Sequence, residues 1–240
     1  MPKPSILQIG PYPEWDQAPL EAAFEMLKPY EAEDAQAYLA EHGPKARGIA
    51  TRGNLTVGRD VMDACPNLEV IVVYGVGYDG VDIAACKARG IRVTNTPDVL
   101  TGDVADFGGA MMLALSRGIV GGEAWVRSGA WATKGGFQLG RRVFGQKAGI
   151  LGLGRIGDAV ARRLVGFNMQ IAYSDVGPKH YASGWTFIAD PVALADWADV
   201  LFVTLSATAD TAGLVGQKVL EALGPDGMLV NISRASNVDE

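Results

Sequence analysis

Short apolar blocks and amphipathic blocks follow one another along almost the whole chain. Short apolar runs bounded by polar or turn-forming residues predict buried strands. Blocks with apolar residues at every third or fourth position, closed by glycine or proline, predict helices. Strands that alternate with helices are typical of parallel sheets with helices on both faces. The pattern therefore predicts an α/β fold.

Residues 1–98 repeat this alternation and predict one open parallel-sheet domain. Its clearest buried strand is the run LEVIVV, and Pro29 and Gly90 close two of its helices. The predicted strands are 5–9, 48–51, 68–73 and 91–94, and the predicted helices are 20–27, 34–41, a short segment ending at Cys65, and 81–89.

Residues 99–240 predict a second open sheet. Its clearest buried strand is the run DVLFVTL, and five strands alternate with helices in the manner of a doubly wound nucleotide-binding domain. The predicted strands are 149–151, 169–174, 186–188, 199–205 and 228–232, and the predicted helices are one starting near Arg155, then 191–197 and 215–223.

The stretch that joins the two predicted sheets is harder to assign. Pro97 and Gly102 predict a crossover, and Thr101 is a plausible N-cap for a helix at 103–117. That helix is apolar on nearly all sides, so we expect it to be buried between domains or subunits. Residues 118–146 look less regular. Trp125 and Trp131 indicate either core packing or an extended arm at a dimer interface, and both interpretations stay open.

Composition narrows the class of protein. A net charge of −6 and a pI near 5.0 argue against nucleic-acid binding. Cys65 and Cys86 are too few for a disulfide framework and predict reduced thiols in the cytoplasm. The chain starts Met-Pro-Lys-Pro, without a recognisable signal peptide, and the apolar stretch 107–115 is too short to span a bilayer. We expect no membrane partner and no metal site.

The most specific chemical signal is the run GLGRIG. Gly152, Gly154 and Gly157 have the spacing G-x-G-x-x-G between a predicted strand and a predicted helix. In such a turn the first glycine permits the bend, the second lets a pyrophosphate approach, and the third lets helix and strand pack closely. The helix start near Arg155 offers N–H groups and a positive dipole to phosphate. The alternative is a glycine turn that binds no nucleotide.

The choice between NAD and NADP depends on the end of the next predicted strand. Asp175 follows that strand, 18 residues after Gly157, where an acid can hold the ribose hydroxyls. A carboxylate there binds a 2′-hydroxyl and repels a 2′-phosphate, so the sequence favours NAD. Lys179 follows closely, and a cation in this loop can accommodate the phosphate of NADP.

Four motifs together resemble the D-isomer-specific 2-hydroxyacid dehydrogenases, most of all the glyoxylate/hydroxypyruvate reductase branch. They are VGYDGVD at 76–82, TPDVLTGDVADF at 96–107, GLGRIG at 152–157 and LVNISRASNVDE at 229–240. The resemblance implies a flavodoxin-like substrate-binding domain, a Rossmann domain that binds NAD or NADP, and a homodimer with the active site in a cleft. It implies reduction of a small 2-keto acid to the D-2-hydroxy acid.

The resemblance also assigns roles to single residues. Arg234 matches the catalytic arginine, whose fork can hold the substrate carboxylate and polarise the keto oxygen. Val76 and Gly77 match the loop whose backbone N–H groups bind the same carboxylate. The cofactor positions that it implies are Thr101, Gly152, Leu153, Gly154, Arg155, Ile156, Gly157, Asp175, Leu205, Ser206, Thr211, Ile232 and Ser233.

Three departures from the family pattern matter. Ala235 stands where glycine is usual, and Ser206 stands where proline is frequent. The third is the region that would hold a glutamate and the acid/base histidine, which the 240 residues do not include. His42, expected to be exposed, and His180 do not match that histidine. We therefore expect a truncated member whose turnover is weak or absent. The alternatives are a nucleotide-sensing, corepressor-like protein and a remnant that cannot bind nucleotide.

Overall fold

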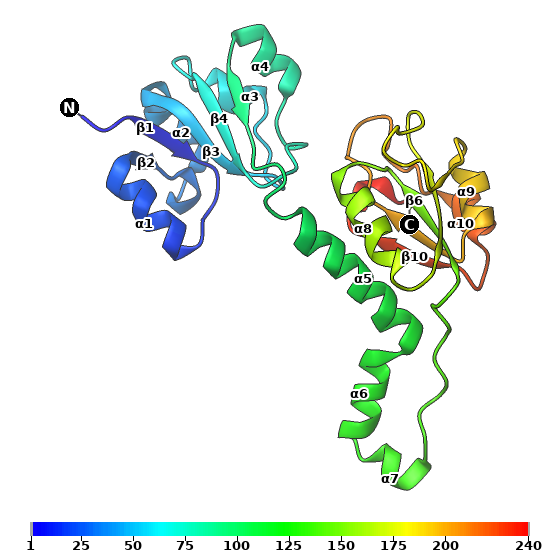
Figure 1. Ribbon diagram of the computed structural model, residues 1–240. Coiled ribbons are helices and arrows are strands. Elements are labelled where there is room, and N and C mark those ends of the chain that lie inside the picture. Colours follow the sequence, from blue (N-terminus) through cyan, green and yellow to red (C-terminus); the bar gives the residue numbers. More distant parts are fainter. Residues whose placement is uncertain (1, 240) are drawn as a thin grey trace. The chain divides into compact units, whose positions relative to one another are not determined.

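The computed structural model describes residues 2–239 and divides into two compact units, Met1–Val99 and Leu100–Glu240. Each unit is built on one five-stranded sheet in which all strand pairs are parallel (Figure 1). The predicted α/β class with two open parallel sheets is confirmed.

The first unit has the strand order β2-β1-β3-β4-β5. Leu7, Ile49, Ile71 and Val73 project from its central strands into one buried core, which Met62 completes. The strands are β1 (Ser5–Gln8), β2 (Glu25–Leu27), β3 (Ala46–Arg52), β4 (Val70–Tyr74) and β5 (Arg92–Thr94), and the helices are α1 (Glu14–Ala23), α2 (Ala35–His42), α3 (Arg59–Asp63) and α4 (Ile83–Arg89).

The predicted helix at 20–27 is wrong. The helix α1 begins earlier and ends at Ala23, and residues 25–27 form the edge strand β2, paired with β1 from Ser5 to Leu7. Leu20, Phe24 and Leu27 have helical spacing, which explains the error. Backbone pairing to β1 and burial of Leu27 outweigh that local pattern, because β-structure depends strongly on tertiary context.

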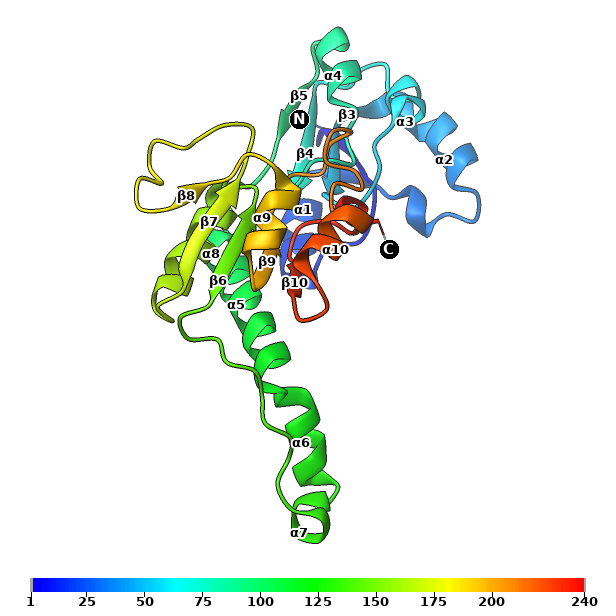
Figure 2. The same cartoon turned by 90° about the vertical axis from the view of Figure 1, so that its right-hand side faces the viewer.

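The second unit has the strand order β10-β9-β6-β7-β8, the order of a doubly wound sheet. Figure 2 shows β7, β6, β9 and β10 in this sheet, with α9 and α10 in front of it. Apolar clusters cover both faces, so the inner strand β9 is buried throughout. The elements are β6 (Lys147–Leu151), α8 (Arg155–Val165), β7 (Gln170–Ser174), β8 (Thr186–Phe187), α9 (Pro191–Trp197), β9 (Val200–Val203), α10 (Gln217–Leu223) and β10 (Met228–Asn231).

The helix α5 (Thr101–Arg117) opens the second unit. Thr101 is its first residue and not its N-cap; Leu100 takes that place, without a side-chain cap bond. Only one face of α5 is buried, where it packs on α8 and β10. Gly108 on that face lies close to Ile232, because a Cβ at Gly108 would stand 3.0 Å from the Ile232 Cδ1 atom.

Residues 118–144 are more regular than the sequence predicts. The helices α6 (Ile119–Arg127) and α7 (Ala130–Lys134) follow α5, and Figure 1 shows both away from the sheet of this unit. Trp131 is exposed, so it is not a core residue, and Trp125 packs against Phe137 with ring centroids 6.1 Å apart.

Within residues 2–239, Cys65 and Cys86 are buried and free, as predicted. No single helix of that range has the length and apolar character needed to cross a membrane; only α5 and α6 taken together, at a bend of 59°, reach it. No cluster of three or more His, Cys, Asp or Glu side chains that could hold a metal ion occurs there either.

Candidate functional site

The glycine turn between β6 and α8 has a geometry that two of its three glycines require. Gly152 has φ +89°, in the range that favours glycine, and a Cβ there would lie 3.0 Å from the Leu205 backbone. A Cβ on Gly157 would lie 2.3 Å from the Gly152 carbonyl oxygen and 2.8 Å from the Thr204 Oγ1 atom. Both positions therefore exclude a side chain for reasons of packing.

Gly154 differs from its neighbours in a way that fits a ligand. A Cβ there would meet no atom within 4 Å, so packing within the protein does not require glycine. Gly154 is the N-cap of α8, and no side chain caps that helix end. The first N–H groups of a helix lack acceptors within the helix, and the helix dipole favours an anion there. The open space over Gly154 and this uncapped end fit the pyrophosphate of a dinucleotide.

Thr204 braces the glycine turn from the strand beside it. Its hydroxyl donates to the Gly152 carbonyl at 2.6 Å and lies 3.0 Å from the Leu151 carbonyl oxygen. The Gly152 N–H donates to the Ser174 carbonyl at 2.8 Å, which ties the turn to the end of β7 as well. The sequence does not predict a role for Thr204, because a single threonine at the end of a buried strand belongs to no recognisable motif.

The loop that follows β7 holds Asp175 in an ion pair. The Lys179 Nζ atom lies 2.8 Å from the Asp175 Oδ1 atom, and this contact raises the pKa of Lys179. The Tyr181 hydroxyl donates to the Leu153 carbonyl at 2.6 Å, so the loop is fastened to the glycine turn. The ion pair brings Lys179 to Asp175, and the tyrosine contact brings Tyr181 to Leu153. Asp175 and Leu153 are both predicted cofactor positions.

The loop that follows β9 contains Leu205, Ser206 and Thr211. The Thr211 hydroxyl donates to the Ser206 carbonyl at 2.7 Å and accepts the Thr208 N–H at 2.9 Å. Leu205 packs on the core, and a Cβ at Gly152 would lie 3.0 Å from its backbone. These contacts place the loop beside the glycine turn.

Arg234 lies in a loop whose backbone is fixed by asparagine side chains. The Asn231 Nδ2 atom donates to the Arg234 carbonyl at 2.9 Å, and the Asn231 Oδ1 atom accepts the Ser233 N–H at 2.9 Å. The buried Asn237 side chain donates to the Ser233 Oγ atom at 2.9 Å. Ile232 donates its N–H to the Val203 carbonyl at 3.2 Å. Sequence reasoning missed both asparagines, although each flanks the arginine motif.

The loop of Val76 and Gly77 lies in the first unit, directly after β4. Asn95 donates its Nδ2 hydrogen to the Val76 carbonyl at 2.8 Å, and Thr96 donates its N–H to the Gly75 carbonyl at 3.0 Å. Within the described part of the chain, the N–H groups of Val76 and Gly77 have no hydrogen-bond acceptor. They are therefore available to an anion.

Each of the two histidines packs against a tyrosine. His42 ends α2 and is half-buried, with its ring 4.3 Å from the Tyr38 ring, so the expectation of an exposed side chain is wrong. The two rings are tilted by 57°, and this contact contributes to the burial of the imidazole. His180 is exposed, with its ring 5.2 Å from the Tyr181 ring in the loop after β7.

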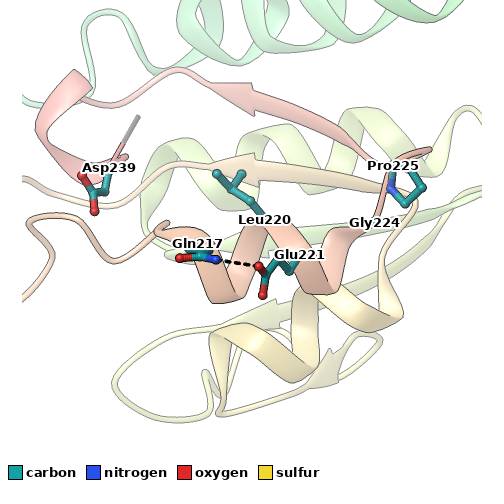
Figure 3. Close-up of a pocket in the computed structure, with 6 residues that line it drawn as sticks. All are labelled: Gln217, Leu220, Glu221, Gly224, Pro225 and Asp239. Atoms are coloured by element: carbon teal, nitrogen blue, oxygen red, sulfur yellow. Dashed lines mark hydrogen bonds between the residues drawn. The ribbon is translucent and has the colours of Figure 1, made fainter.

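An open hollow of about 730 Å³ lies along α10, away from the predicted positions (Figure 3). Its lining contains none of the site residues expected from the sequence. Gln217 and Glu221 are bonded to each other at its edge, at 2.7 Å. The lining residues are Gln217, Leu220, Glu221, Gly224, Pro225 and Asp239.

Known proteins match the chain over most of its length. A sequence profile described as D-isomer specific 2-hydroxyacid dehydrogenase, NAD binding domain, matches residues 109–240. A 2-ketogluconate reductase of Gluconobacter oxydans (strain 621H) is 42% identical over 240 residues, which cover 99% of this chain and 75% of that protein.

Two solved structures extend the comparison to three dimensions. A 2-hydroxyacid dehydrogenase from Ketogulonicigenium vulgare Y25 superposes with a TM-score of 0.91 at 65% identity, over 100% of this chain and 75% of that one. An NADPH-dependent glyoxylate/hydroxypyruvate reductase from Sinorhizobium meliloti, in complex with NADP and malonate, gives a TM-score of 0.90 at 40% identity, over 99% of this chain and 73% of that one.

Proposed function

The chain belongs to the D-isomer-specific 2-hydroxyacid dehydrogenases, and from this premise we propose that it binds NAD(P)H and reduces a small 2-keto acid such as glyoxylate or hydroxypyruvate. The observation that carries the proposal is the open space over Gly154 at the uncapped start of α8. The Sinorhizobium reductase of similar fold, described as NADPH-dependent, supports the same cofactor class.

The cofactor half of the proposal rests on four loops of the second unit and on the start of α5. The N–H groups at the start of α8, at Arg155 and Ile156, would bind the pyrophosphate. The loop of Leu205, Ser206 and Thr211 would run beside the dinucleotide. Thr101, Ile232 and Ser233 would line the nicotinamide, which supplies the hydride when it is bound. The ribose that carries the 2′-hydroxyl would lie near Asp175. Taken alone, the carboxylate of Asp175 supports NAD rather than NADP.

The substrate half rests on one charged side chain and two backbone donors. The planar guanidinium of Arg234 can bind a carboxylate through two parallel hydrogen bonds and stabilise negative charge on the keto oxygen. The family resemblance assigns the same carboxylate to the N–H groups of Val76 and Gly77 in the first unit. Asn231 and Asn237 act as positioning residues, since Asn231 bonds the Ser233 N–H and the Arg234 carbonyl, and Asn237 bonds the Ser233 hydroxyl.

Reduction of the keto group also needs a proton donor. The turnover expected of the 240-residue chain depends on whether one of its own residues can act as that donor. The two histidines lie at the end of α2 and in the loop after β7, and neither matches the acid/base histidine of the family pattern. General acid catalysis contributes about 10²–10⁴-fold to rate. We expect the chain to bind NADPH or NADH with a clear thermal shift, but to reduce glyoxylate at least about a hundredfold more slowly than the glyoxylate/hydroxypyruvate reductase of Sinorhizobium meliloti.

A stopped-flow or steady-state assay with both proteins, at equal cofactor saturation, measures this difference. Binding with weak turnover is the expected result, and rates within tenfold of the relative would contradict it. A protein that only senses nucleotide would bind the cofactor and show no turnover at any enzyme concentration, so the same assay separates that alternative. The absence of any thermal shift would remove the dinucleotide proposal, because a ligand that binds the native state stabilises it.

We also propose that the segment 107–144 forms a homodimer interface. Large apolar side chains are exposed all along it, and such a concentration marks a protein contact. Phe137 packs over Gly121, so the segment that follows α6 is held against that helix. The exposed side chains are Phe107, Leu115, Ile119, Val120, Val126, Trp131, Leu139 and Phe144.

The proposed dimer is tested by placing a charge among the exposed apolar side chains of the segment 107–144. Trp131→Asp is expected to shift the protein from dimer to monomer in light scattering after size-exclusion chromatography, because a buried unpaired carboxylate is costly. Trp15→Asp is the matched control, since Trp15 is 77% exposed and Trp131 59% exposed, and Trp15 lies in the other unit. A dimer that survives Trp131→Asp would overturn this interface.

Two buried free thiols, with no disulfide within the described residues, support a reducing compartment such as the cytoplasm for this reaction.

A further inference from the structure

The carboxylate that should exclude NADP is already paired with a cation. The Asp175 Oδ1 atom lies 2.8 Å from the Lys179 Nζ atom, and the two side chains are only 14% and 26% exposed. The same oxygen accepts the Val176 N–H at 2.7 Å. Because both side chains are largely shielded from solvent, water screens their attraction less than it would at an open surface.

This pairing changes what the site offers to the ribose 2′ position. A lone carboxylate repels a 2′-phosphate, whereas a carboxylate bound to an ammonium presents nearly no net charge. The ammonium has three hydrogens, and its bond to Asp175 uses one of them. The remaining donors can bind phosphate oxygens. Lysine is a frequent phosphate-binding residue, and it acts there as a compact charge.

The loop holds this ammonium next to the glycine turn. The Ser174 carbonyl, directly before Asp175, accepts the Gly152 N–H at 2.8 Å. The Lys179 N–H donates to the Tyr173 hydroxyl at 2.8 Å, and the Tyr181 hydroxyl donates to the Leu153 carbonyl at 2.6 Å. The backbone of Lys179 is therefore bonded to a side chain of β7, and the Tyr181 side chain fastens the loop to the glycine turn. Order of this kind lowers the entropy cost of binding a ligand.

We propose that Lys179 is the residue that selects the cofactor: it neutralises Asp175 and binds the 2′-phosphate, so that the chain binds NADPH at least as tightly as NADH. The proposal rests on the proposed dinucleotide site. It concerns one ion pair in that site, and it can fail while the site itself binds both dinucleotides.

The test is calorimetric titration of the full 240-residue chain with NADPH and with NADH at one fixed ionic strength. The wild type is expected to have a Kd for NADPH no larger than that for NADH. Lys179→Met is expected to raise the Kd for NADPH by about tenfold or more, the weight of one hydrogen bond to a charged group. The same variant should change the Kd for NADH by less than about threefold, since NADH carries no 2′-phosphate.

Two further variants keep the result interpretable. Lys218→Met removes an exposed lysine on α10 and should change neither Kd. Asp175→Asn keeps Lys179 but removes the opposing charge, so NADPH should bind more tightly than to the wild type. A wild type that prefers NADH by tenfold, or an unchanged ratio of the two Kd values in Lys179→Met, would overturn the inference. If neither dinucleotide binds the wild type, the proposed function fails and the inference falls with it.

Discussion

Gly154→Val is expected to abolish most dinucleotide binding without unfolding the protein. The backbone of Gly154 is extended, with φ −83°, a conformation open to any residue, and a Cβ there would have no atom within 4 Å beyond its chain neighbours. The new side chain would instead occupy the space through which a pyrophosphate reaches the start of α8. Losing two hydrogen bonds to a charged phosphate, at about 1.5–3 kcal/mol each, corresponds to about a hundredfold or more in Kd.

Calorimetric titration with NADPH gives the affinity, and a melting curve gives the stability. Gly157→Ala is the matched control, because its Cβ would lie 2.3 Å from the Gly152 carbonyl oxygen. Such a clash in a packed turn costs about 3 kcal/mol, and we expect a fall in Tm of about 10 °C. Gly154→Val should leave Tm within about 2 °C of the wild type. Tight NADPH binding by a folded Gly154→Val protein would contradict the assignment of this turn.

Replacing Arg234 by methionine is expected to remove substrate binding and to leave cofactor binding intact. The useful probe is oxamate, an unreactive analogue of a 2-keto acid, because its binding does not depend on turnover. Loss of a bidentate partner for a carboxylate costs about 2–5 kcal/mol, so the Kd for oxamate in the presence of NADPH should rise by about a hundredfold. The Kd for NADPH should change by less than about threefold.

Two other variants define what the arginine contributes. Arg234→Lys retains the charge but not the planar fork, and we expect an intermediate loss of about tenfold. Arg162→Met removes an exposed arginine that is bonded to Asp158 on α8, and it should not affect oxamate. Equal oxamate affinity in the wild type and Arg234→Met would exclude Arg234 from the substrate site, even with a working cofactor site.

The sequence predicts the parts of this fold in which local signals and tertiary packing agree. The buried strands of the second unit and the glycine turn fall within a few residues of their predicted places, because long apolar runs and glycine spacing report burial and backbone shape directly. The helix α6 was not predicted, since Gly121 and Gly122 lower helix propensity. The structure shows why glycine is present: Phe137 lies against this face, 2.9 Å from where a Cβ at Gly121 would stand.

The contacts that define the candidate site depend on strands distant in sequence, and this is why they could not be predicted. Thr204 meets Gly152 across 52 residues, and Tyr181 meets Leu153 across 28. No periodicity links such pairs. The ion pair of Lys179 and Asp175 is closer in sequence, but only the turn of the chain after β7 brings the two charges together. The sequence alone favours NAD from Asp175, and that preference stays a prediction which the ion pair argues against.

Gly108 carries no side chain, and this lets Ile232 pack directly on the helix α5. The chain joins Ile232 to Arg234 through one residue, and a Cβ at Gly108 would lie 3.0 Å from the Ile232 Cδ1 atom. A side chain at Gly108 would therefore press on the tip of Ile232, which would have to move by a few tenths of an ångström or turn to another rotamer. Misplacement of a reacting group by about 1 Å can cost a hundredfold in rate. For the substrate-binding role proposed for Arg234, the packing of this helix therefore matters, although Gly108 lies far from the arginine in sequence.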